Sequence, residues 1–137
     1  MQTQSISTTE QHPRARFLRR ALQANALFSL LTGFAFVLAS GPIAKLLGPQ
    51  IPGWVVIIVG FGLLPFGFMV YRSAANDLQQ ARLISVMDIA WVFGSFLLLG
   101  LGWSLFSVAG RWFVGLQAEA VFTFAVLQMI GLRRLKK

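Results

Sequence analysis

LISVMDIAWVFGSFLLLGLGW, residues 83–103, is the stretch that decides the fold of this chain. It is apolar over most of its length and contains a single charged residue, Asp88. A helix of about 20 residues is long enough to cross the hydrocarbon core of a bilayer. The stretch therefore predicts a membrane-spanning helix that carries one carboxylate inside the membrane.

Three further apolar stretches of similar length surround it, at residues 21–40, 54–71 and 112–132. Of the 137 residues, 56% are hydrophobic and only 12% are charged, which is far from the composition of a soluble domain. We predict an all-α fold, an integral membrane bundle of four transmembrane helices over residues 14–137. Residues 1–13 are polar and lack aromatic residues, and we expect them to form a flexible cytoplasmic tail.

The distribution of basic residues predicts the orientation in the membrane. Ten of the twelve Lys and Arg residues precede the first span, separate the second from the third, or follow the fourth. Only Lys45 and Arg111 lie in the other connections. Positive charge is retained on the cytoplasmic side, so both termini are expected there. The basic residues are then expected to contact anionic lipid headgroups, and no nucleic-acid partner is expected.

Residue types that support catalysis are scarce in the predicted spans. The chain has no cysteine, which excludes disulfides, thiolate metal sites and thiol redox chemistry. Its single histidine, His12, precedes the first span, so a pair of imidazoles cannot ligate a haem in the membrane. Asp88 and Glu119 are predicted to lie about 12 Å apart in depth, too far for a catalytic carboxylate pair. We expect no enzyme activity, no catalytic residues, no metal site and no cofactor.

Polar residues in the first, third and fourth spans predict a cluster inside the membrane. Asn25 follows Arg19 by six residues, and Asp88 follows Arg82 by six residues. Each side chain therefore lies roughly 9 Å above the same boundary. Gln128, on the antiparallel fourth helix, falls near this depth. The cluster of Asn25, Asp88 and Gln128 is either a polar clasp that holds the helices in register or a proton or cation site.

The fourth span carries polar residues on two nearly opposite faces. At 100° per residue, Gln117 and Gln128 share one face, whereas Gly115, Glu119 and Thr123 occupy the other. Either the bundle encloses a wide polar cavity, or one of the faces contacts another subunit or another membrane protein. We expect a helix-packing contact at Glu119, where the glycine allows close approach, and a ligand or proton site is the alternative.

Two residues indicate a pocket or a bend. Trp91 follows Asp88 by three residues and lies inside a span, where its indole N–H needs a partner. It either forms a pocket wall beside Asp88 or fills the space between helices. Pro65 is expected to kink the second span, as a packing bend or as part of a transport site.

Several sequence features together resemble those of small bacterial four-helix integral membrane proteins of unassigned function. The features are a basic amino end followed by ANALFSLLTGF at 24–34, GPIAKLLG at 41–48, an Asp-x-x-Trp in the third span and GLRRLKK at 131–137. The resemblance covers residues 14–137 and implies a bacterial inner membrane, with an internal bacterial membrane as the alternative. It brings no catalytic residues. Small multidrug-resistance transporters also have four short helices, but their functional acid lies in the first helix, where this chain has Asn25.

These observations predict a structural or interaction subunit that makes helix–helix contacts in the bilayer. We expect a homo-oligomer or a larger membrane complex, with membrane lipids around it. The alternative is a small proton- or cation-coupled transporter or channel that uses Asp88 and Glu119.

Overall fold

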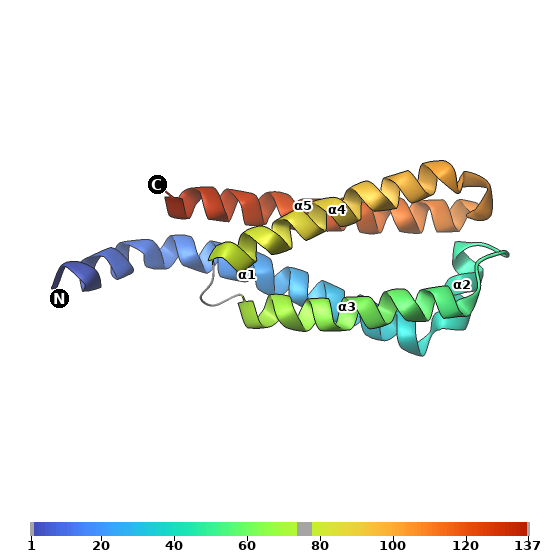
Figure 1. Ribbon diagram of the computed structural model, residues 1–137, viewed down its shortest axis with the longest axis horizontal. Coiled ribbons are helices and arrows are strands. Elements are labelled where there is room, and N and C mark those ends of the chain that lie inside the picture. The colour runs from blue at the N-terminus through green and yellow to red at the C-terminus, as the bar shows by residue number, and fades with distance from the viewer. Residues whose placement is uncertain (1, 74–77, 137) are drawn as a thin grey trace.

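The computed structural model describes the backbone of residues 2–73 and 78–136 and the side chains of residues 15–72 and 78–135. Its elements are α1 (Gln2–Leu38), α2 (Ser40–Leu47), α3 (Gly53–Ser73), α4 (Leu78–Leu101), the 3-10 turn η1 (Trp103–Leu105) and α5 (Val108–Lys136) (Figure 1). Four helices contain segments long and apolar enough to cross a membrane: Ala15–Leu38, Gly53–Arg72, Leu78–Leu101 and Val108–Leu135. The prediction of an all-helical chain with four candidate spans is confirmed.

The helices extend beyond the predicted spans at the end where the chain termini lie. Helix α1 is helical from Gln2, so residues 2–13 continue the first helix as far as the backbone is described. The division of the chain into a flexible tail and a membrane domain stays a prediction, and residue 1 lies outside the described residues. Helix α4 begins at Leu78, five residues before the predicted third span, because the intervening LQQAR contains only good helix formers.

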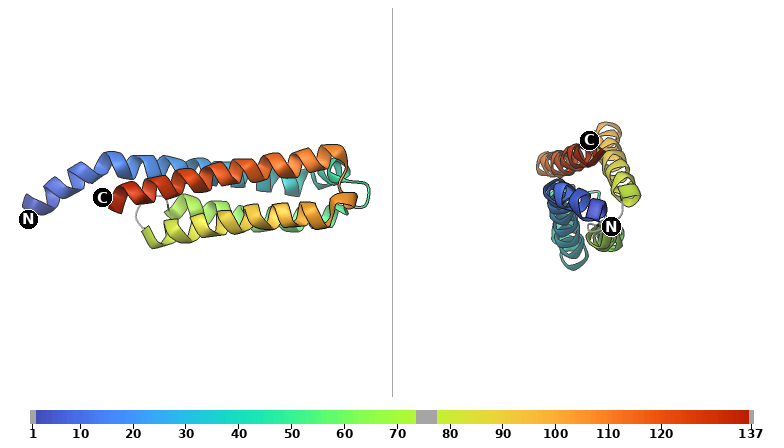
Figure 2. Two further views of the ribbon diagram at one scale, coloured as in Figure 1. Left: turned by 90° about the horizontal axis from the view of Figure 1, so that it is seen from above. Right: turned by 90° about the vertical axis from the view of Figure 1, so that its left-hand side faces the viewer.

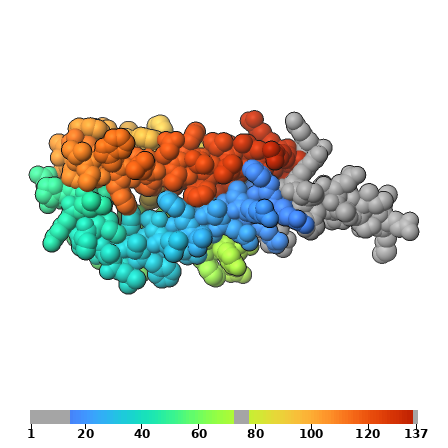
Figure 3. Space-filling model, turned by 180° about the vertical axis from the view of Figure 1, so that it is seen from behind, coloured from blue at the N-terminus to red at the C-terminus, as the bar shows by residue number. Residues whose placement is uncertain are grey.

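The bundle consists of two helical hairpins. Helix α1 packs along α3, α4 packs along α5, and contacts between α1 and α5 join the two pairs. Helices α3 and α4 contact each other over only a few residues. The end-on view in Figure 2 shows α1 and α5 on one side and α3 and α4 on the other. From behind, α5 lies directly above α1 (Figure 3).

Glycines allow the close approach of α1 to α3. A Cβ added at Gly60 would lie 2.9 Å from the backbone oxygen of Gly33 and 2.9 Å from the Cβ of Phe36. A Cβ added at Gly67 would lie 2.9 Å from Leu30. These distances are shorter than van der Waals contact, so the first hairpin depends on small residues in the way that membrane helix pairs commonly do.

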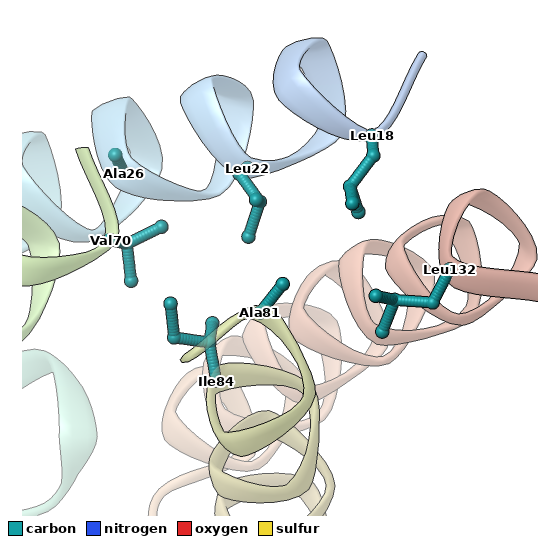
Figure 4. Close-up of a cluster of buried hydrophobic side chains, with 7 residues drawn as sticks. All are labelled: Leu18, Leu22, Ala26, Val70, Ala81, Ile84 and Leu132. Carbon is teal, nitrogen blue, oxygen red and sulfur yellow. The ribbon is translucent and has the colours of Figure 1, made fainter. Parts of the chain in front are cut away.

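Two apolar clusters close the ends of the bundle. The cluster at the end where the termini lie draws on α1, α3, α4 and α5 and consists of Leu18, Leu22, Ala26, Val70, Ala81, Ile84 and Leu132 (Figure 4). The cluster at the α2 end consists of Phe36, Ala44, Leu47, Val56, Phe106 and Val114. Among the buried polar residues, Asn25 and Ser85 lie at the inner edge of the first cluster, next to its members Ala26 and Ile84.

The connection between α4 and α5 is fixed to the end of α2. Ser107 donates its backbone N–H to the oxygen of Leu47 at 2.8 Å, and its hydroxyl donates to the oxygen of Leu46 at 2.6 Å. The same hydroxyl accepts from the N–H of Gly110 at 2.9 Å. A Cβ at Gly110 would overlap the backbone of Leu47, so only glycine fits at this contact. The α2 end of the two hairpins is thereby held together.

The outer surface of the helices is strongly apolar. Leu31, Phe93 and Leu116, on three different helices, are each more than half exposed, as are many other large hydrophobic side chains. Exposed apolar surface of this extent is unfavourable in water and suits a lipid environment.

Candidate functional site

A buried hydrogen bond joins the two hairpins beside the apolar cluster at the end where the termini lie. Asn25 on α1 donates from Nδ2 to Oδ2 of Asp88 on α4, over 2.7 Å, and both side chains are buried. Ser29, one turn along α1, donates its hydroxyl to Oδ1 of Asn25 at 3.3 Å. Helices α1 and α4 belong to different hairpins, so this bond links helices that the chain does not place next to each other.

Gln128 on α5 completes the predicted cluster. Its side chain is fully buried, and its Oε1 accepts from the hydroxyl of Ser85 on α4 at 3.0 Å. The same hydroxyl also lies 3.0 Å from the backbone oxygen of Ala81. Gln128 lies beside the carboxyl group of Asp88, but its Nε2 has no acceptor in hydrogen-bonding geometry among the described residues. The structure thus brings Asn25, Asp88 and Gln128 together, with one buried donor left unpaired.

No cationic side chain pairs with Asp88 in the described part of the chain. Arg82, six residues before Asp88, and Arg19 and Arg20, which precede Asn25 by six and five residues, all have exposed side chains. Asp88 is therefore held by a neutral amide donor, and its charge has no counter-ion from residues 15–72 or 78–135. A carboxylate in apolar surroundings is costly unless it is neutralised or paired.

A second polar link connects α4 and α5 nearer the α2 end. The indole Nε1 of Trp91 donates to Oε1 of Gln117 at 2.9 Å. Nε2 of Gln117 in turn donates to the hydroxyl oxygen of Ser95 at 3.1 Å. Both ends of the Gln117 amide are used, so this side chain fixes the orientation of the Trp91 ring.

A cavity of about 810 Å³, partly open to the outside of the bundle, lies between the two hairpins. Its polar wall comes from α1, α4 and α5 and consists of Ser29, Thr32, Asp88, Trp91, Ser95 and Gln117. Its apolar wall on α3 consists of Val55, Val56, Val59, Gly62, Leu63 and Phe66. The volume lies within the range of pockets that hold small organic molecules.

Of the two residues predicted to mark a pocket or a bend, Trp91 lines the cavity and Pro65 does not. Trp91 is among the residues that line the cavity, and its indole N–H bonds to Gln117 on α5. Helix α3 continues through Pro65 from Gly53 to Ser73, and the Pro65 side chain is exposed. Pro65 is not among the residues that line the cavity. The kink at Pro65 stays a prediction.

The other predicted site residues lie on the outer face of α5. Glu119 and Thr123 are exposed, and the hydroxyl of Thr123 donates to the backbone oxygen of Glu119 at 3.0 Å. The Glu119 carboxylate has no hydrogen-bond or ion-pair partner among the described residues. A Cβ at Gly115 would meet nothing within 4 Å. Glu119 and Asp88 thus face in different directions and do not form one site within this chain.

Comparison with protein-family models, with curated proteins and with solved structures finds no match to this chain.

The α3 wall of the cavity was not predicted from the sequence. A continuous apolar run has the same pattern whether the residues line a cavity or face lipid. A weak signal was present in two glycines, Gly62 in the second span and Gly94 in the third. Both line the cavity, and a Cβ at either would meet nothing within 4 Å. Small residues on two helices that contact each other over only a few residues leave space between them.

Proposed function

We propose that this chain is a small polytopic membrane protein that acts as a structural or interaction subunit through helix–helix contacts in the bilayer. It is proposed to lie in the bacterial inner membrane, or in an internal bacterial membrane, with both termini in the cytoplasm. Its partners are a second copy of the chain or a larger membrane complex. Anionic lipid headgroups surround the basic residues at the cytoplasmic side.

The observation that carries this proposal is the carboxylate of Glu119 on the outer face of α5. Its side chain is exposed within a segment apolar enough to span a membrane, and no described residue pairs with it. An acid at this depth is unfavourable against lipid tails and is stabilised by a polar partner. Gly115, one turn away, leaves open space in which a neighbouring helix can approach.

Cross-linking tests the contact directly, because the chain has no native cysteine. Thr123→Cys, on the exposed face beside Glu119, is expected to cross-link to a second copy or to a co-purifying membrane protein in native membranes. Glu119→Gln is expected to reduce the cross-linked fraction several-fold, because it removes the carboxylate from the contact. Gly115→Leu is expected to do the same by keeping the neighbouring helix away.

Gly100→Leu on α4 is the matched control, since a Cβ at this glycine also meets nothing within 4 Å. It is expected to leave the cross-linking unchanged. A chain that stays monomeric and uncross-linked in native membranes, whichever residue stands at position 119, would contradict the proposal.

A proton- or cation-coupled transporter or channel is the second candidate, and the cavity beside Asp88 favours it. Glu119 points away from this cavity, so a path that uses both acids needs a second subunit. Flux measurements in proteoliposomes test this candidate. Asp88→Asn is expected to abolish the flux. Equal fluxes for the wild type, Asp88→Asn and Glu119→Gln would contradict the transporter or channel function.

A further inference from the structure

We propose that the cavity between α3 and α4 is a binding site for a lipophilic amine. The ammonium group of the ligand lies at Asp88, and its apolar body lies against α3. This site is separate from the proposed contact on the outer face of α5 and does not depend on it.

Charge complementarity selects a cation. Asp88 is an acid on the wall of the cavity, and no cationic residue in the described part of the chain pairs with it. Asn25 contributes a neutral donor and leaves the charge of the carboxylate uncompensated. An ammonium group supplies the missing counter-charge together with N–H donors, and such charge-assisted bonds are strong where water is excluded.

Two hydroxyl groups on the α1 wall of the cavity can accept hydrogen bonds. The Ser29 hydroxyl donates its hydrogen to Oδ1 of Asn25. Its oxygen can still accept a hydrogen bond from a ligand in the cavity. Thr32 adds a second hydroxyl one turn further along α1. An ammonium group has N–H donors and no acceptor, which fits a wall that offers a carboxylate and hydroxyl oxygens. An anionic ligand group would be repelled by the Asp88 carboxylate.

The remaining walls suit an apolar and aromatic body. Trp91 is fixed by its hydrogen bond to Gln117, and its ring forms part of the wall next to Asp88. The face of an aromatic ring attracts an ammonium group electrostatically. On the opposite side, Val59, Leu63 and Phe66 present an apolar surface. At about 810 Å³, the cavity has room for a ligand larger than a short alkylamine.

Three probes with one skeleton test the charge requirement. They are 4,4-diphenylbutylamine, the corresponding alcohol and the corresponding carboxylate, measured with the full chain in lipid nanodiscs. Binding of the radiolabelled amine is measured by scintillation proximity, with empty nanodiscs subtracted to remove partitioning into lipid. The unlabelled amine is expected to displace the label at a concentration roughly tenfold or more below that of the alcohol, and the carboxylate is expected not to compete.

Variants locate the site. Asp88→Asn is expected to weaken binding of the amine by roughly tenfold or more and to leave the affinity for the alcohol unchanged. Gly94→Leu places a side chain in the open space of the cavity and is expected to abolish binding of both probes. Gly100→Leu, on the same helix and also with open space at Cβ, does not line the cavity and is expected to bind like the wild type. Glu119→Gln controls for an acid elsewhere in the membrane.

Three results would each overturn the proposal. The first is no saturable binding of the amine to the wild type, and the second is displacement by the alcohol as effective as by the amine. The third is unchanged binding in Gly94→Leu. The comparison of probes on the wild type requires no substitution, so it decides the charge requirement even where Asp88→Asn fails to fold. If Thr123→Cys gave no cross-link while the amine still bound, the proposed subunit contact would be contradicted and the amine site would not.

Discussion

At the scale of single residues, the Asn25–Asp88 hydrogen bond joins α1 to α4 through two buried side chains. It is short, at 2.7 Å, and both side chains are buried. Interhelical hydrogen bonds in membrane proteins contribute about 0.6–2 kcal/mol, because the separated helices also find some partners. Removing only one partner costs more than the bond itself, since a buried polar group is then left unsatisfied.

We therefore expect Asn25→Ala to destabilise the chain by about 1–2 kcal/mol, because Asp88 loses its donor. The free energy of unfolding is measured by reversible denaturation with SDS in mixed micelles. Gln23→Ala is the control, as Gln23 is exposed on the same helix. Equal stability of the two variants would mean that the bond contributes nothing to the fold.

At the scale of the elements, glycine decides how closely α1 and α3 pack. Gly60 faces α1, where a Cβ would come within 2.9 Å of Gly33 and Phe36, whereas Gly62 faces open space in the cavity wall. The two glycines are two residues apart on the same helix and have the same helix propensity. They therefore separate the effect of interhelical packing from that of the glycine itself.

Gly60→Ala is expected to destabilise the chain by about 1–3 kcal/mol, because the added methyl group forces α1 and α3 apart. Gly62→Ala is expected to have no such cost and to raise stability slightly through better helix propensity. Both are measured by the same SDS denaturation as above. If the two substitutions had similar effects, the close approach of the hairpin helices would not be a source of stability.

At the scale of the whole molecule, the two ends of the bundle differ in charge. The end where the termini lie carries most of the basic residues, whereas the α2 end has Lys45 and Arg111. The guanidinium of Arg111 stacks on the ring of Trp103 at 4.1 Å and donates to its backbone oxygen. This arrangement keeps the arginine close to the chain at the end that is expected to lie outside the cytoplasm.

Single cysteines test this orientation in bacterial spheroplasts. Gln50→Cys at the α2 end is expected to react with a membrane-impermeant maleimide in intact spheroplasts. Leu78→Cys at the other end is expected to react only after permeabilisation, because the basic residues at that end predict a cytoplasmic location. Both positions are exposed, so access to the thiol depends on the side of the membrane. Labelling of both positions in intact spheroplasts would indicate two orientations and contradict the prediction.

Much of the fold and part of the candidate site could be predicted from local properties of the chain. A span is recognised from length and apolar composition, which need no knowledge of its neighbours. The equal depth of Asn25 and Asp88 follows from the constant rise of a helix, and the structure places these residues in contact. The Trp91–Gln117–Ser95 link was not predicted, because it depends on which faces of α4 and α5 turn toward each other.

The sequence by itself determined that the chain forms four long apolar helices and which residues carry polar groups at each depth. Only the tertiary structure decided that α1 pairs with α3, that α4 pairs with α5 and that α3 and α4 hardly touch. It also decided that Asp88 faces a cavity while Glu119 faces outward. The physical reason is that helix formation depends on hydrogen bonds within each segment, whereas pairing depends on surface shape, such as the fit of Gly60 against Gly33.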